Sequence, residues 1–172
     1  SLPLKHHPGE RWTYGLNTDV LGYLVEVWSG MTLNDFLRKR IFEPLGMKDT
    51  HFYQPASNHG RLVTLYQGTA DGKNKRVETL IYDRVDAGYP NAKGTYFSGG
   101  AGLSSTIEDY AKFLQMYLNK GEYNGVRLLS RKTIELMLTD QHIDGAQVGL
   151  GFGLETEAND HQSVISLGSF QW

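Results

Sequence analysis

Helical and strand-like patterns follow one another in blocks along this chain. Two helical patterns lie within residues 18–44, strand-like runs follow between 61 and 82, further helical patterns lie within 105–138, and a strand-like tail covers 148–154. Strictly alternating strands and helices would predict a doubly wound parallel sheet, whereas blocks of each favour segregated helices and antiparallel strands. The sequence therefore predicts an α+β fold.

Start and stop residues delimit the helical patterns. Thr18 or Asp19 is expected to cap the first helix, which runs to Gly30 with one buried apolar face. Thr32 is a cap for a second helix, which Pro44 is expected to stop. A third helix follows the capping box of residues 105–108 and closes at Gly121, and a fourth begins after Ser130.

The strand-like runs indicate a hairpin and a separate tail strand. Residues 61–66 and 76–82 are rich in β-branched and aromatic side chains and flank Asp71-Gly72. This pattern predicts a hairpin with a long loop, and the apolar residues interleaved with glycine at 148–154 predict a strand.

Composition excludes several classes of partner and chemistry. The 172 residues have a net charge of −2, with no long run of one sign, so the chain lacks the basic surface that nucleic acids or anionic membranes attract. There is no cysteine, which excludes disulfides and thiolate chemistry. No apolar stretch is long enough for a membrane helix, and residues 1–7 do not form a signal peptide.

Neither metal binding nor phosphate binding is favoured by the motifs. None of the six histidines shows the His-x-x-x-His spacing that places two ligands on one helix face, and adjacent His6 and His7 are expected on the surface. The glycine-rich residues 98–105 lack both the dinucleotide and the P-loop patterns, so we expect a tight loop leading into a capped helix.

A self-sufficient nucleophile is also missing from the sequence. There is no Gly-x-Ser-x-Gly elbow and no Ser-x-x-Lys, in which a lysine one helical turn after a serine could remove its proton. Tyr14 could act as a proton relay if a cation lowered the pKa of its phenol from about 10. From the residues alone, a packed aromatic with a hydrogen-bonded hydroxyl is the favoured explanation of Tyr14.

Several motifs in order resemble one family. Residues 8–15 read PGERWTYG, 19–22 read DVLG, 36–50 read FLRKRIFEPLGMKDT, 99–106 read GGAGLSST, and 149–153 read GLGFG. Their combination and order resemble the β-lactamase-like, penicillin-recognising serine hydrolases, which include class C β-lactamases, D-alanyl-D-alanine carboxypeptidases and esterases. The resemblance covers nearly the whole chain.

The resemblance implies a fold and a mechanism. The fold is an antiparallel sheet flanked by helices, with a mostly helical subdomain beside it and the active site between them. A serine in Ser-x-x-Lys is acylated while a tyrosine relays protons. Tyr14 falls where the family places this catalytic tyrosine, and no metal or cofactor is implied.

Two departures from the family pattern narrow the expectations. β-Lactamases and many peptidases read Tyr-Ala/Ser-Asn, whereas this chain reads YGLN, so Asn17 is one position late and the esterase branch is favoured. Residues 167–172, LGSFQW, resemble the lead-in to the third motif, so Trp172 would be a substrate-binding residue. We therefore expect residues 1–172 to be an internal fragment of one domain, without the Ser-x-x-Lys part before it and the strands after Trp172.

The leading hypothesis is a serine hydrolase that cleaves an ester or amide through an acyl-enzyme, with this fragment inactive alone. An esterase or D-amino-acid peptidase acting on a small-molecule or peptidoglycan-like substrate is favoured over a β-lactamase. The alternative is a non-catalytic binding or assembly module of the same family. The resemblance favours a periplasmic or secreted location, and residues 51–97 are expected to border the cleft and shape specificity.

Overall fold

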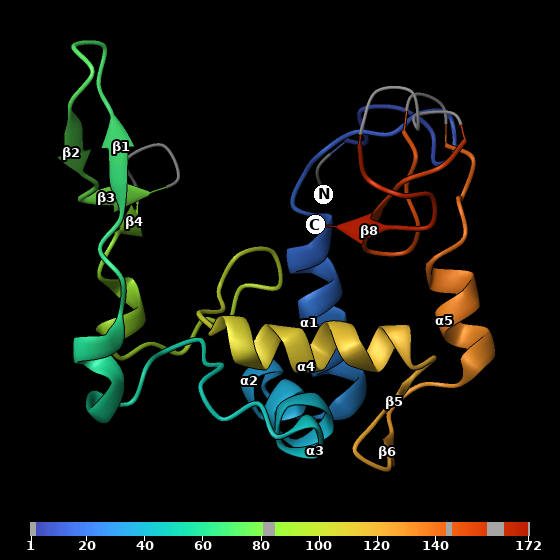
Figure 1. The fold of residues 1–172 in the computed structure, drawn as a ribbon, viewed down its shortest axis with the longest axis horizontal. Helices are drawn as coiled ribbons and strands as arrows, with labels where there is room; N and C mark the ends of the chain where they lie inside the picture. Colours follow the sequence, from blue (N-terminus) through green and yellow to red (C-terminus); the bar gives the residue numbers. More distant parts are fainter. Residues whose placement is uncertain (1–2, 81–84, 144–145, 158–163, 172) are drawn as a thin grey trace. The chain divides into compact units, whose positions relative to one another are not determined.

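The computed structural model describes residues 3–80, 85–143, 146–157 and 164–171. The chain divides into two compact units: the terminal unit holds Ser1–Gly15 and Phe113–Trp172, and the central unit holds Leu16–Lys112. Helices and four separate two-stranded antiparallel sheets make up the described elements, which confirms the α+β prediction (Figure 1).

Helix α1, Asn17–Ser29, opens the central unit. Its N-cap residue is Leu16, whose side chain makes no capping hydrogen bond, so the predicted cap, Thr18 or Asp19, is wrong by two or three residues. Gly30 ends the helix as predicted: it is left-handed, with φ 66°, and its N–H donates to the carbonyl of Glu26 at 2.9 Å.

The predicted buried face of α1 is not covered by the described residues. Val20 and Leu21 are 56% and 57% exposed, and Trp28 is 76% exposed. The helix packs instead through its one buried residue, Gly22, where an added Cβ would lie 2.9 Å from Leu33 and 3.2 Å from the Cα of Gly99. A close backbone approach, not the apolar face, therefore makes this contact.

A continuous helical segment with a π turn follows α1. It consists of α2 (Leu33–Leu37), the π turn η1 (Arg38–Phe42) and α3 (Glu43–Leu45). Thr32 caps it as predicted, accepting from the N–H of Asp35 at 3.1 Å. The prediction that Pro44 stops the helix is wrong, because α3 continues through Pro44 to Leu45 and ends at the left-handed Gly46, with φ 68°.

Apolar side chains from this segment and the residues after it form the core of the central unit. Leu33, Leu45 and Phe52 are 4%, 2% and 2% exposed. Phe42 and Met47, which are near Leu45 in the sequence, are also buried. The ring of Phe52 also meets Phe97 edge-on at 5.2 Å. The core thus links the helices to the segment that precedes α4.

The region between α3 and α4 contains short elements. These are η2 (Ala56–Arg61), β1 (Tyr66–Gly68), β2 (Asn74–Arg76), β3 (Thr79–Leu80), β4 (Val85–Asp86) and η3 (Tyr89–Asn91). The hairpin around Asp71-Gly72 is confirmed, with Gly72 at φ 78° and Gln67 opposite Lys75. Its strands lie closer to the turn than predicted: Arg61 belongs to η2, and Thr79–Leu80 form β3, which pairs with β4. Residues 81–82 lie outside the described residues.

Helix α4, Ile107–Leu118, begins over a buried polar network. Thr106 caps it by accepting from the N–H of Asp109 at 3.2 Å, so the cap lies one residue after the predicted Ser105. Asp109 is only 3% exposed and accepts from the Asp49 N–H at 2.7 Å, the Thr50 hydroxyl at 3.0 Å and the Lys112 ammonium at 3.0 Å. These bonds fasten the start of α4 to residues 49–50.

The terminal unit combines α5 with two hairpins. Its elements are β5 (Glu122–Tyr123), β6 (Val126–Arg127), α5 (Arg131–Met137), β7 (Gly153–Leu154) and β8 (Phe170–Gln171). Ser130 caps α5 as predicted, accepting from the N–H of Thr133 at 3.0 Å. Tyr117, Phe152 and Phe170 form an aromatic cluster with ring centres 5.0 to 5.9 Å apart.

The predicted strand at 148–154 is mostly a turn. The N–H of Gly149 donates to Phe152 O at 2.8 Å, Gly151 has φ 93°, and Val148 pairs with Gly153 across the turn. Only Gly153 and Leu154 form a strand, because the left-handed glycine reverses the chain direction.

Candidate active site

Tyr14 lies at the end of a turn-rich segment of the terminal unit. Gly9 is left-handed, with φ 86°, and the N–H of Glu10 donates to His7 O at 3.2 Å, so residues 7–10 form a turn. His6 Nε2 and Thr13 Oγ1 are 2.9 Å apart. This contact holds the two sides of the turn together immediately before Tyr14.

The Tyr14 side chain is exposed and available. It is 70% exposed, its ring lies 6.1 Å from that of Trp12 at a tilt of 58°, and no described residue hydrogen-bonds its hydroxyl. The alternative interpretation of Tyr14, a packed aromatic with a hydrogen-bonded hydroxyl, is therefore not observed among the described residues. An accessible phenol is what a proton-relay residue requires.

The strand that leads to the expected third motif belongs to the same unit as Tyr14. Strand β8 pairs antiparallel with β7, with Leu154 opposite Phe170, and the N–H of Glu155 donates to Ser169 O at 2.9 Å. Trp172, the expected substrate-binding residue, lies outside the described residues. The sequence-separated ends of the chain thus share one compact unit.

A polar network in the central unit was missed at the level of sequence. The Asp19 carboxylate oxygen Oδ1 accepts from the Ser98 hydroxyl at 2.6 Å and from the Tyr96 hydroxyl at 3.1 Å. The hydrogen bond from Ser98 is the main cause of a lowered pKa of Asp19; burial opposes it, and Tyr96 and the N–H of Gly100 reinforce it. Asp19 is therefore a carboxylate at neutral pH, and not the helix cap that its position suggested.

The glycine-rich loop uses its own N–H groups internally. Ser98 Oγ accepts from the N–H groups of Gly100 and Ala101, each at 3.2 Å, while it donates to Asp19. These donors are occupied and a carboxylate stands beside them, so the loop is not arranged to hold a phosphate. This confirms the expected tight loop before a capped helix.

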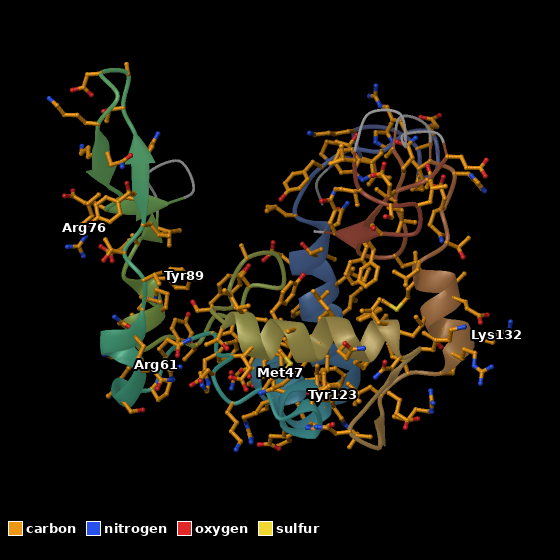
Figure 2. The ribbon with its side chains drawn as sticks, viewed as in Figure 1. Met47, Arg61, Arg76, Tyr89, Tyr123 and Lys132 are labelled. Atoms are coloured by element: carbon orange, nitrogen blue, oxygen red, sulfur yellow. The ribbon has the colours of Figure 1, made fainter. Side chains whose placement is uncertain are left out.

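A cavity of about 600 Å³ lies within the central unit, in the region between η2 and α4. Apolar Leu62, Val77 and Pro90 line it together with Arg76 and Tyr89, which Figure 2 shows in this part of the chain. Burial raises the pKa of the Tyr89 phenol, whose hydroxyl donates to the carbonyls of Ala101 and Gly102. The cavity is large enough for a drug-sized molecule.

Other kinds of site are not seen in the part of the chain that the structure describes. No group of three His, Asp or Glu side chains there is placed to hold a metal ion. Nor does any helix in the described ranges combine the length and apolar character needed to cross a membrane.

Comparison with known proteins identifies the family. The β-lactamase family model matches residues 1–172. Protein Rv1367c of Mycobacterium tuberculosis is 35% identical over 100% of this chain and 45% of its own length. The ML-236A carboxylate methylbutanoyltransferase of Penicillium citrinum is 33% identical over 94% of the chain and 34% of its own. The lovastatin esterase of Penicillium rubens is 36% identical over 69% of this chain and 29% of its own length.

A solved structure shows the same fold. EstCE1, described as a hydrolase with promiscuous acyltransferase activity, superposes with a TM-score of 0.80 at 23% identity, over 97% of this chain and 46% of its own. The chain thus spans less than half the length of these relatives. With the family model matched from end to end, the chain belongs to the β-lactamase family, which confirms the β-lactamase/transpeptidase-like fold.

Proposed function

We propose that this chain is the middle part of a serine hydrolase domain that cleaves esters or amides through an acyl-enzyme, with Tyr14 as the proton-relay residue. The observation that carries the proposal is the exposed Tyr14 phenol, two residues before the N-cap of α1, in a chain that matches the family along its whole length. One relative is named a methylbutanoyltransferase and another an esterase, and these names support acyl-transfer chemistry.

In the proposed mechanism, the nucleophile comes from outside this chain. A serine of Ser-x-x-Lys, which the 172 residues do not contain, attacks the substrate carbonyl and displaces the alcohol or amine. Tyr14, supported by the lysine of that motif, accepts the proton of the serine and passes it to the leaving group. Water then hydrolyses the acyl-enzyme. Because the nucleophilic serine lies outside the 172 residues, we expect this chain alone to be inactive.

The YGLN sequence at Tyr14 favours an esterase or D-amino-acid peptidase over a β-lactamase, since the amide of Asn17 is displaced by one position. Residues 51–97 are proposed to shape specificity. The cavity lined by Leu62, Val77 and Tyr89 supports this role, because it lies in that region.

The test is the Tyr14→Phe variant in the longer protein that carries this chain. A short-chain p-nitrophenyl ester, a D-alanyl-D-alanine peptide and a chromogenic cephalosporin are compared. We expect cleavage of the ester or peptide above that of the cephalosporin, and a loss of kcat of about 100-fold or more in the variant.

Tyr23→Phe is the matched control, because Tyr23 is a tyrosine of similar exposure, 65%, on α1. It should retain the wild-type rate. Equal activity of Tyr14→Phe and the wild type would refute the assigned role, and absence of Ser-x-x-Lys from the longer protein would favour a non-catalytic binding or assembly module.

A further inference from the structure

Five apolar residues of α1 share one side of the helix. At about 100° per residue they lie within a sector of about 120°. Val20, Leu21 and Val27 are 56%, 57% and 56% exposed. Trp28 is 76% exposed, and Leu24 is half-buried. We call these five residues the apolar face of α1, most of which the described residues leave uncovered.

Both charged residues of α1 lie on the opposite side of the helix, where they bind the central unit. Asp19 accepts hydrogen bonds from two hydroxyls of residues 96–98, and Glu26 Oε1 accepts from the N–H of Leu33 at 2.7 Å. Gly22, the one buried residue of α1, lies on this side too. A surface helix normally turns its apolar side to the core and its charged side to water, and α1 does the reverse. The apolar face is therefore expected to be covered by something outside the central unit.

We propose that the apolar face of α1 is an interface with the part of the domain outside residues 1–172. The chain covers 45% of protein Rv1367c and 46% of EstCE1, so more than half of the length of such relatives lies outside it. The covering surface is apolar and uncharged, because a charge placed against this face would be buried without a partner. The inference uses the part of the proposed function that places the chain in a longer domain, and it does not depend on Tyr14.

The size of the apolar face favours a contact within one chain over an interface between two proteins. The 13 residues of α1 make a helix about 20 Å long and about 10 Å wide, so one side offers roughly 200 Å². A stable interface between separate proteins buries about 800 Å² on each partner. Parts of one folded chain do not lose translational freedom when they pack together, so a smaller apolar contact is sufficient.

The test is photo-cross-linking in the longer protein that carries this chain. Trp28→p-benzoylphenylalanine keeps an aromatic side chain on the apolar face, and under ultraviolet light it joins covalently to an adjacent C–H group. Digestion and mass spectrometry then identify the peptide that has been joined. We expect a cross-link within one molecule to a peptide outside residues 1–172, which is absent without illumination.

A truncation measures how far the apolar face is buried in the same longer protein. Leu21→Ala should lower the urea midpoint of unfolding by about 1–2 M, the fall expected when a buried leucine is shortened. Ile107→Ala is the matched control, because Ile107 is 93% exposed at the first residue of α4. Its midpoint should stay within about 0.3 M of the wild type, as for other surface substitutions.

Three results would overturn the inference. Cross-links only to peptides of residues 1–172 would assign the apolar face to this chain, and cross-links between two molecules would assign it to a second copy. A Leu21→Ala midpoint equal to that of the wild type would show that the face is in contact with water. None of these results changes the rate of Tyr14→Phe, so the proposed catalytic role of Tyr14 stands or falls separately.

Discussion

Replacing Asp109 removes the acceptor of a buried network that fastens α4 to residues 49–50. The carboxylate accepts three hydrogen bonds, at 2.7, 3.0 and 3.0 Å, and one of them comes from the ammonium of Lys112. Hydrogen bonds to a charged group contribute about 1.5–3 kcal/mol each, but they are not additive. Breaking a buried charged pair by removing one partner destabilises by about 3–5 kcal/mol, which we expect for Asp109→Ala.

Asp109→Asn keeps the shape of the side chain and one accepting oxygen, so we expect about half that loss, ~2 kcal/mol. The assay is urea unfolding followed by far-ultraviolet circular dichroism at pH 7. With a slope of about 2 kcal/mol per molar urea, the midpoint should fall by ~1 M in Asp109→Asn and ~2 M in Asp109→Ala.

The stability lost in Asp109→Asn should decrease as the pH is lowered. Burial alone would raise the pKa of Asp109, but the bonds from Lys112, Asp49 and Thr50 outweigh burial and hold the pKa below its ordinary value. A folded-state pKa below the unfolded value of about 3.9 stabilises the fold above that value, and this contribution disappears as the pH falls through the folded-state pKa. The difference between wild type and Asp109→Asn should therefore shrink below pH ~4.

The control is Asp35→Ala, which removes a half-exposed ion pair with Arg38 and should change stability by no more than ~0.5 kcal/mol. A loss below ~0.5 kcal/mol in Asp109→Ala, or a difference that stays constant from pH 7 to pH 3, would refute the assignment of a buried ionised network.

Two further stability predictions follow from close packing. Gly99→Ala would place a methyl group 2.2 Å from the carbonyl oxygen of Thr18 and should destabilise by about 1–3 kcal/mol, whereas Gly60→Ala, with nothing within 4 Å, should change the urea midpoint little; equal midpoints would contradict the backbone contact. Phe152→Ala removes a ring that is 7% exposed and packs on two other aromatic rings, so we expect a loss of about 3–5 kcal/mol and of near-ultraviolet circular dichroism.

Local signals were sufficient at several positions where the deciding partner is close in sequence. Thr32 and Ser130 cap helices by bonding to N–H groups three residues later, and Gly30 ends α1 within a single turn. The position of Tyr14 ahead of a helix was also predictable from the adjoining residues. In each case the interaction spans only a few residues, so the sequence contains both partners side by side.

The sequence could not predict features that depend on distant partners. Asp19 has the residue type and position of a helix cap, but the hydroxyl groups that it binds lie 77 and 79 residues away in the sequence. The apolar residues around Val63 resemble a strand, yet they border a cavity and the strands begin only at Tyr66. Propensity reports local preference, and at Asp19 contacts with distant residues decided the outcome.

The π turn at Arg38–Phe42 lets the helical segment hold one extra residue without turning the helix that follows. A π turn contains one more residue than the α-helical turn it replaces, so the residues on either side keep about the same phase. Deleting exposed Lys39 would therefore restore an uninterrupted α-helix with α3 in nearly its present orientation. Leu45, now 2% exposed, would stay in the core, whereas one residue deleted from an ordinary α-helix would turn it by about 100°.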